Sequence, residues 1–272
     1  MLRASINQSI RKFGTNASIT CNRLQGKVAI VTASTDGIGF SIARRLAQEG
    51  AKVMISSRKE NNVKKAVEEL QSEGLQVAGT VCHVGKAEDR KNLIEQTKLS
   101  FGGLDILVSN AAANPAIGAV LDSAEEVWDK IFDINVKATF LLMKESLPLL
   151  KTSKSSSIII ISSIAGYQPF NLLGIYSISK TALMGLIKAT AEDLAKEGIR
   201  VNGIAPGVIK TKFSAPLHKS KEAQELSLAL IPMKRFGTTD EIGSVAAFLA
   251  SDDASYITGE IIVASGGMPS RL

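Results

Sequence analysis

The chain contains few of the residues from which disulfide scaffolds and metal sites are built. Its 272 residues include two cysteines, Cys21 and Cys82, and two histidines, His83 and His218, which lie far apart in the sequence. Two single thiols are typical of a reducing compartment, and no metal-ligand cluster is visible. No apolar run reaches the length that a helix needs to cross a bilayer. We therefore expect no disulfide scaffold, no bound metal and no membrane-spanning segment.

Acidic residues are missing from the first 25 residues, where Arg3, Arg11, Lys12 and Arg23 supply four of the net +6 charges. Residues 1–23 are also rich in Ser, Asn and Thr, a composition that fits a mitochondrial transit peptide and a disordered extension about equally well. The remaining body is nearly neutral and carries no basic stripe. Nucleic acid is therefore not an expected partner.

Strand and helix patterns alternate from residue 27 to the end of the chain, with no linker between two cores. The expected strands are residues 27–32, 52–57, 76–82, 104–109, 158–161, 199–205 and 260–264. A long helical region is expected over residues 123–150. This alternation predicts one α/β domain over residues 24–272, with a seven-stranded parallel sheet and helices on both faces.

Three polar residues follow the fifth strand at a suggestive spacing. Ser163 stands just after the run Ile158 to Ile161, where a buried parallel strand delivers its hydroxyl to the carboxyl edge of the sheet. Tyr176 and Lys180 lie four apart at the start of a helical pattern, so they share one face. A cation beside a phenol favours the phenolate, which predicts a lowered tyrosine pKa and general acid–base chemistry.

A glycine-rich turn, from Thr32 to Gly39, joins the first strand to its helix. Such a turn lets backbone N–H groups and the helix dipole face a pyrophosphate. The second strand ends in Ser57 and Arg58, where sites for NAD carry an acid that binds the ribose hydroxyls. A hydroxyl and a cation suit a 2′-phosphate, so we expect NADP.

Several further motifs occur in order along the chain. They are Ser109-Asn-Ala-Ala112, Asn135 within D-I-N-V-K, Ser163 followed by Tyr176-Ser-Ile-Ser-Lys180, and Pro206-Gly-Val-Ile-Lys-Thr211. Together with the glycine turn, they make residues 24–272 similar to the short-chain dehydrogenase/reductase family in its one-domain form. The resemblance implies a single-domain Rossmann fold and metal-free hydride transfer with a nicotinamide cofactor.

The resemblance also implies a role for each matching residue. Tyr176 would be the acid or base, Lys180 would lower its pKa and bind the nicotinamide ribose, Ser163 would polarise the substrate oxygen, and Asn135 would position a relay water. The residues expected to bind the cofactor are Thr32, Ser34, Asp36, Gly37, Ile38, Gly39, Ser57, Arg58, His83, Asn110, Tyr176, Lys180, Ile209 and Thr211. Those expected to bind substrate are Ser163, Tyr176 and Phe170.

Three positions depart from the family pattern. Ala33 and Ala112 stand where glycines are usual, and each methyl is tolerated if the backbone there is not left-handed. His83 stands where many relatives carry an aspartate that accepts from the adenine amino group. A neutral imidazole nitrogen would accept that bond, or the ring would stack on adenine, or His83 would only cap its loop.

Longer stretches, such as V-C-H-V-G-K-A-E-D-R, resemble a peroxisomal subgroup of NADP-dependent retinol dehydrogenases and carbonyl reductases. This implies reduction of lipophilic ketones, aldehydes or retinal by NADPH, in a homotetramer. Apolar residues near Phe170 and a lid over about residues 208–236 favour an uncharged substrate. The alternatives are a 3-oxoacyl thioester reductase and a non-catalytic NADP-binding protein.

The last three residues, Ser270-Arg271-Leu272, resemble the peroxisomal address S-K-L with arginine in place of lysine. They favour the peroxisome as the location of the protein. The basic N-terminus leaves the mitochondrion as the alternative.

Overall fold

The computed structural model describes residues 22–270, except for Lys219 and the side chain of His218. Residues 1–21 of the expected N-terminal extension lie outside the described residues, as do Arg271 and Leu272 of the expected peroxisomal address. Within the described residues, no helix is long and apolar enough to cross a membrane.

A seven-stranded parallel sheet runs through the molecule in the order β3-β2-β1-β4-β5-β6-β7. The strands are β1 (Val28–Val31), β2 (Lys52–Ser57), β3 (Val77–Val81), β4 (Ile106–Ser109), β5 (Ser156–Ile161), β6 (Ile199–Pro206) and β7 (Ile261–Ala264). The central strands are buried on both faces, which explains their nearly unbroken apolar sequences. The predicted Rossmann fold is confirmed, because strand order reverses direction between β1 and β4.

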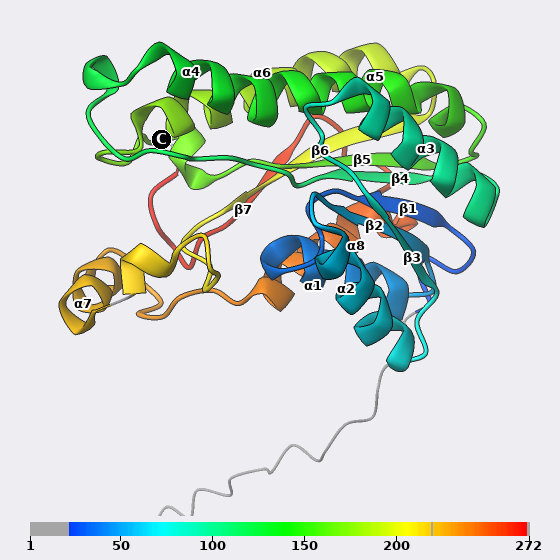
Figure 1. Cartoon of the computed structure of the whole chain (residues 1–272), viewed down its shortest axis with the longest axis horizontal. Coiled ribbons are helices and arrows are strands. Elements are labelled where there is room, and N and C mark those ends of the chain that lie inside the picture. The colour runs from blue at the N-terminus through cyan, green and yellow to red at the C-terminus, as the bar shows by residue number, and fades with distance from the viewer. Residues whose placement is uncertain (1–21, 219, 271–272) are drawn as a thin grey trace, which may run out of the picture.

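Helices cover both faces of the sheet (Figure 1). One face carries α1 (Gly37–Gln48), α2 (Glu60–Ser72) and α8 (Thr239–Ala250), and the other carries α3 (Ala87–Phe101), α5 (Ala138–Leu150) and α6 (Gly174–Ala195). Each face buries its own apolar cluster. The loops at the carboxyl ends of β1, β4, β5 and β6 therefore meet at one edge, where such sheets bind ligands.

The expected helix over residues 123–150 is divided into three parts. These parts are α4 (Glu125–Phe132), a π-helical turn (Asp133–Lys137) and α5. The π turn holds Asn135, and such turns occur frequently at functional sites. Hydrophobic periodicity did not reveal this turn because a single inserted residue barely changes the pattern of apolar positions.

The expected lid segment contains a helix that was not predicted, α7 (Lys221–Ala229). None of its residues is buried, and it lies away from the two helical layers (Figure 1). Leu226 and Leu230, four residues apart, are 73% and 64% exposed. The segment thus presents apolar side chains outward beside the edge where the strands end.

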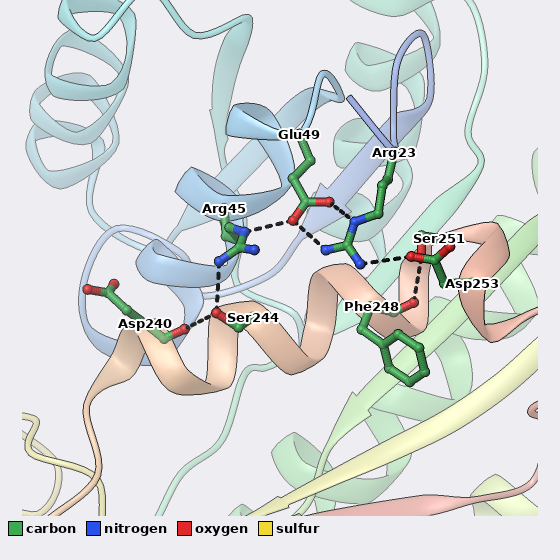
Figure 2. Close-up of polar contacts among 8 residues, drawn as sticks. All are labelled: Arg23, Arg45, Glu49, Asp240, Ser244, Phe248, Ser251 and Asp253. Carbon is green, nitrogen blue, oxygen red and sulfur yellow. Dashed lines mark hydrogen bonds and ion pairs between the residues drawn. The ribbon is translucent and has the colours of Figure 1, made fainter. Parts of the chain in front are cut away.

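A buried carboxylate joins the start of the folded body to α1 and α8 (Figure 2). Glu49 accepts two hydrogen bonds of 2.6 Å from Arg23 and one of 2.7 Å from Arg45. Arg23 also pairs with Asp253 beyond α8, and Arg45 donates to Ser244 within α8. Arg23, the last residue of the expected extension, is therefore part of the ion-paired body.

Candidate active site

Ser163 and Tyr176 meet at the carboxyl end of β5. Ser163 has an extended backbone and caps a short 3-10 turn (Ile164–Gly166), in which its hydroxyl oxygen accepts a 3.1 Å bond from the N–H of Ala165. The chain then returns to begin α6, whose first turn carries Tyr176. Burial raises the pKa of the Tyr176 phenol, and the nearby hydroxyl of Ser163 acts in the opposite direction. Two hydroxyl groups thus converge on one point, as a carbonyl oxygen requires.

Lys180 lies one turn beyond Tyr176, and its side chain is almost completely buried. Its ammonium group donates a 2.8 Å hydrogen bond to the carbonyl of Ile161, the last residue of β5. The same nitrogen lies 5.4 Å from the centre of the Tyr176 ring. The spacing in the sequence therefore does place amine and phenol on one face of the helix, as predicted.

The expected lowering of the Tyr176 pKa does not occur in this structure. Burial raises the pKa of Tyr176 to about 12, and the hydrogen bond with Ser163 only partly opposes that shift. Burial also lowers the pKa of Lys180 to about 7, so much of its charge is absent at neutral pH. The physical reason is desolvation, which outweighs the attraction between ammonium and phenolate when both groups leave water.

Asn135 faces the same centre from the π-helical turn and is fully buried. Its Oδ1 accepts from the N–H of Ala113 at 2.7 Å, and its Nδ2 donates to the carbonyl of Ala113 and to the hydroxyl of Ser179. The side-chain amide is thus committed to protein partners. A relay water of the predicted kind would bind the second lone pair of Oδ1 or of the main-chain carbonyl, which also accepts from Thr139.

The glycine turn begins with residues whose polar groups point into the protein. Ser34 is buried, and its N–H and hydroxyl both bond to β2 at Ser56. The Thr32 hydroxyl accepts from the N–H groups of Asn110 and Ala111. The Asn110 amide in turn donates to the carbonyls of Thr32 and Ala33 at 3.0 Å. These predicted cofactor-binding residues therefore build the turn, and the hydroxyls of Thr32 and Ser34 and the Nδ2 of Asn110 are taken up by protein partners.

The end of the turn fits a phosphate group. Asp36 caps α1, and its carboxylate accepts from Gly37, which has a φ of 58°. A Cβ on Gly39 would lie 2.5 Å from the Ala33 carbonyl and 2.5 Å from Nδ2 of Asn110, so only glycine allows this approach. The first N–H groups of α1, including that of Ile38, have no carbonyl partner within the helix and remain for an anion.

The methyl group of Ala33 is tolerated without strain only if its backbone is not left-handed, and this condition is not met. Ala33 has a φ of 50°, in the left-handed region, whereas Ala112 does not. A side chain at such an angle costs about 1 kcal/mol or more. The alanine at this turn is therefore strained, and its methyl is accommodated only at that cost.

Three further predicted cofactor residues lie at the ends of β2 and β3. Ser57 is half-buried and Arg58 is exposed, without an ion-pair partner among residues 22–270. His83 follows β3, and its Nδ1 accepts from the N–H of Gly85. That bond matches the loop-capping alternative and leaves Nε2 as the protonated nitrogen of a neutral ring. Nε2 is then a donor, so His83 cannot accept from an adenine amino group while this bond holds.

The segment after β6 contacts both halves of the site through three consecutive residues. The methyl group of Thr211 lies near Gly37, and Lys212 forms a 2.5 Å ion pair with Asp36. The ring of Phe213 lies 5.8 Å from that of Tyr176, at a tilt of 42°. Sequence reasoning placed Phe213 in the lid but missed Lys212, because no local pattern shows that two segments 176 residues apart will meet.

Ile209 and Phe170, predicted to bind cofactor and substrate respectively, both pack against the hydrophobic core. Ile209 is buried in the core against α1 and α8, so only its backbone remains for a ligand, as the resemblance implies. Phe170 is half-buried and packs against the core under α6. A cavity of about 470 Å³ opens behind Ile209, between α8 and the loop after β7, and neither Ser163 nor Tyr176 lines it. Sequence patterns did not indicate this cavity.

With this geometry in view, the chain can be compared with known proteins. A family model described as enoyl-(acyl carrier protein) reductase matches residues 32–269. The chain is 56% identical to "Dehydrogenase/reductase SDR family member 4" of Oryctolagus cuniculus over 92% of this chain and 96% of that one. It is 52% identical to "Tropinone reductase-like 3" of Erythroxylum coca, with 95% and 99% covered.

A solved structure shows the same arrangement of strands and helices. It is a putative short-chain alcohol dehydrogenase from Sinorhizobium meliloti, 33% identical to this chain, with a TM-score of 0.86. The match covers 91% of this chain and 98% of that one. Fold, site geometry and sequence identity agree, and the chain belongs to the short-chain dehydrogenase/reductase family.

Proposed function

We propose that the protein reduces lipophilic ketones and aldehydes, of the retinal or aromatic and dicarbonyl type, with NADPH, and catalyses the reverse oxidation of the alcohols. One observation carries this proposal. The phenol of Tyr176 lies beside the exposed aromatic ring of Phe213, with 5.8 Å between the ring centres, and the hydroxyl of Ser163 is close enough to act on its pKa. An acid and an apolar side chain therefore lie side by side at the edge of the sheet that also carries the glycine turn.

The protein residues supply the proton and hold the oxygen. When bound, the nicotinamide supplies the hydride that reduces the carbonyl carbon. The hydroxyls of Ser163 and Tyr176 hold the carbonyl oxygen, and Tyr176 donates its proton as the alkoxide forms. Because the pKa of Tyr176 is about 12, this phenol is protonated at neutral pH. That state suits reduction, which needs an acid at the start of the reaction.

The choice of NADP is supported by the cation at the end of β2. Arg58 is exposed and no ion pair with a described residue occupies it. The loop between β2 and Glu60, the first residue of α2, contains no carboxylate. A 2′-phosphate therefore meets a free guanidinium and no repelling acid, which favours NADPH over NADH.

The substrate class is supported by apolar side chains on the segments that flank the site in the sequence. Phe213, Leu172 and Leu217 are 57%, 50% and 40% exposed, and they lie on the segments that precede α6 and follow β6. Large exposed apolar side chains at a site indicate an apolar ligand. The names of the tropinone reductase-like relative and of the family model both denote reductases, which agrees with the proposed direction.

A panel of carbonyl substrates, measured with NADPH and NADH in parallel, tests this proposal. We expect turnover of retinal or an aromatic dicarbonyl with NADPH, and a loss of about a hundredfold or more in Tyr176→Phe. Tyr256→Phe is the matched control, because Tyr256 is fully exposed and should not affect the rate. Equal catalytic efficiency with NADH would contradict the role of Arg58.

The same panel separates the two alternatives. The description of the family model favours a thioester substrate, so acetoacetyl thioester is included beside an aromatic ketone. A much higher kcat/KM for the thioester would replace the proposed substrate class with a 3-oxoacyl thioester reductase. Binding of NADPH without turnover of any carbonyl would leave a non-catalytic nucleotide-binding protein.

We also propose a homotetramer and a peroxisomal location. Exposed aromatic side chains on α4 and α5, Trp128 and Phe140, support assembly, and light scattering of the purified chain measures it.

The peroxisomal location is supported by the terminal Ser-Arg-Leu of the sequence. Removal of these three residues should release the protein from peroxisomes, and persistence there, or import into mitochondria, would contradict this address.

A further inference from the structure

The hydroxyl of Ser179 joins two parts of the site that the catalytic residues alone do not connect. Ser179 lies in α6 between Tyr176 and Lys180, and it is fully buried. Its oxygen accepts a 3.0 Å bond from Nδ2 of Asn135. Its proton goes to the carbonyl of Tyr176, at 2.7 Å. One hydroxyl therefore ties the π-helical turn to the first turn of α6.

These bonds complete a hydrogen-bond path from the glycine turn to Tyr176. Asn110 holds the carbonyls of Thr32 and Ala33 in the glycine turn. Three residues later, Ala113 forms two hydrogen bonds with the side-chain amide of Asn135. Asn135 then donates to Ser179. Residues 110–113 after β4 are thus bonded directly to the glycine turn and, through Asn135, to α6.

This hydrogen-bond path has few alternative arrangements, because its last two side chains, Asn135 and Ser179, are buried. With its Oδ1 on one N–H and its Nδ2 on two acceptors, the amide of Asn135 has a single orientation. Without the Ser179 hydroxyl, one amide proton of Asn135 would lose its partner in a place that water does not reach. Among the described residues, the first half of α6 would lose its only side-chain hydrogen bond to the π turn.

We propose that Ser179 is a positioning residue, whose hydroxyl holds the first turn of α6 so that Tyr176 meets Ser163. This inference rests on the proposed reduction of carbonyl compounds for its kinetic test and on the structure alone for its spectroscopic test. Ser179 touches neither substrate nor cofactor in this role. It acts through the backbone of Tyr176 and the amide of Asn135.

Ser177 provides a matched control in the same helix. It lies two residues from Ser179, is equally buried, and its hydroxyl has no hydrogen-bond partner among the described residues. Ser177→Ala and Ser179→Ala therefore remove the same atom from similar surroundings. Only the second substitution breaks the path from Asn135 to Tyr176.

The kinetic test compares the two alanine variants with the wild-type protein. We expect Ser179→Ala to lower kcat about tenfold, whereas the dissociation constant of NADPH stays within about twofold, since the glycine turn is untouched. Ser177→Ala should match the wild type in both. Ser179→Thr, which keeps the hydroxyl, should recover part of the lost kcat, and it carries the test if the alanine variant does not fold.

The spectroscopic test needs no substrate. Absorbance titration of the phenols, with Tyr176→Phe used to assign the signal, follows the pKa of Tyr176 directly. Loosening the first turn of α6 admits water and relieves the burial that raises this pKa to about 12, so the titration of Ser179→Ala should move to lower pH. Ser177→Ala should titrate like the wild type.

The two tests separate the inference from the proposed function. If the wild type reduces no carbonyl compound but the Tyr176 titration moves only in Ser179→Ala, the proposed activity fails and the inference stands. If the wild type is active and Ser179→Ala matches Ser177→Ala in both kcat and titration, the inference is overturned and the activity stands.

Discussion

At the scale of single residues, burial decides the protonation state of the candidate site. Tyr176 and Lys180 are shifted in opposite directions, to about 12 and about 7, because each loses its hydration when charged. Both shifts favour the neutral form. A neutral phenol beside a partly charged amine still carries the proton that reduction of a carbonyl consumes.

Ala33 allows a prediction at the same scale. Its φ of 50° is unfavourable for any residue with a Cβ, and its side chain is exposed, so Ala33→Gly removes strain without removing packing. We expect the free energy of unfolding to rise by about 0.5–1 kcal/mol, after allowance for the greater freedom of glycine in the unfolded chain. Urea denaturation measures this change.

The comparison variant is Ala33→Val, whose branched side chain tolerates the left-handed region least. It should lower the free energy of unfolding by more than about 1 kcal/mol. A stability for Ala33→Gly at or below that of the wild type would show that the turn is not strained at this residue.

At the scale of elements, the approach of α1 to the loop after β4 depends on one missing side chain. Gly39 in α1 lies against the Ala33 carbonyl and the Asn110 amide, both of which are fixed by other bonds. The turn, the helix and the loop can therefore meet only when residue 39 has no Cβ. This contact places the first N–H groups of α1 at the edge of the sheet.

Gly39→Ala should consequently damage both folding and cofactor binding. We expect a loss of about 1–3 kcal/mol in the free energy of unfolding, because backbone and amide must move apart. Binding of NADPH, followed by its fluorescence, should weaken at least about tenfold, since the helix N-terminus moves with them.

Gly185→Ala is the matched control for this prediction. Gly185 lies inside α6 with no heavy atom within 4 Å of a new Cβ, so alanine there should stabilise the helix by about 0.5–1 kcal/mol. Unchanged cofactor binding in Gly39→Ala would mean that the turn adapts without cost, contrary to the structure.

At the scale of the whole molecule, the carboxylate of Glu49 connects segments from both ends of the domain (Figure 2). It joins Arg23 at the start of the folded body to α1, while Arg45 and Asp253 extend the contacts to α8 and the turn beyond it. Burial alone would raise the pKa of Glu49, but hydrogen bonds from Arg23 and Arg45 outweigh it and hold this pKa below 4.5.

Glu49→Gln should therefore destabilise the protein near neutral pH. Two partly exposed arginines lose a buried charge partner, which predicts a loss of about 2–3 kcal/mol in the free energy of unfolding. A lowered carboxyl pKa stabilises the fold above the unfolded value and loses this effect as pH falls through the folded value. The difference between variant and wild type should thus shrink below about pH 4.5.

Glu197→Gln controls for the loss of a surface charge. Glu197 and Lys151 form a partly exposed pair at 3.1 Å, and such pairs contribute about 0–1 kcal/mol. A chain that begins at Leu24 should resemble Glu49→Gln, because it lacks Arg23, whereas a chain that begins at Asn22 should not. Equal stabilities for Glu49→Gln and Glu197→Gln in urea would contradict a structural role for the buried carboxylate.

Much of the fold was predictable because its signals are local. The apolar run from Ile158 to Ile161 and the spacing of Tyr176 and Lys180 each lie within one or two elements, where period and spacing specify which face is buried. The π turn at Asn135 and the helix α7 were missed. The first changes the periodicity by one residue, and the second has no buried face to mark it.

By itself, the sequence determined the alternation of strands and helices, the glycine turn and the order of the residues that converge at the ends of β4, β5 and β6. Those features depend on neighbours along the chain. Only the tertiary structure decided the strained angle at Ala33, the inward polar groups of Ser34, the tie from Asn135 to Ser179 and the neutral phenol of Tyr176. Each of these depends on desolvation or on the approach of segments distant in the chain, and neither is encoded in the spacing of residues.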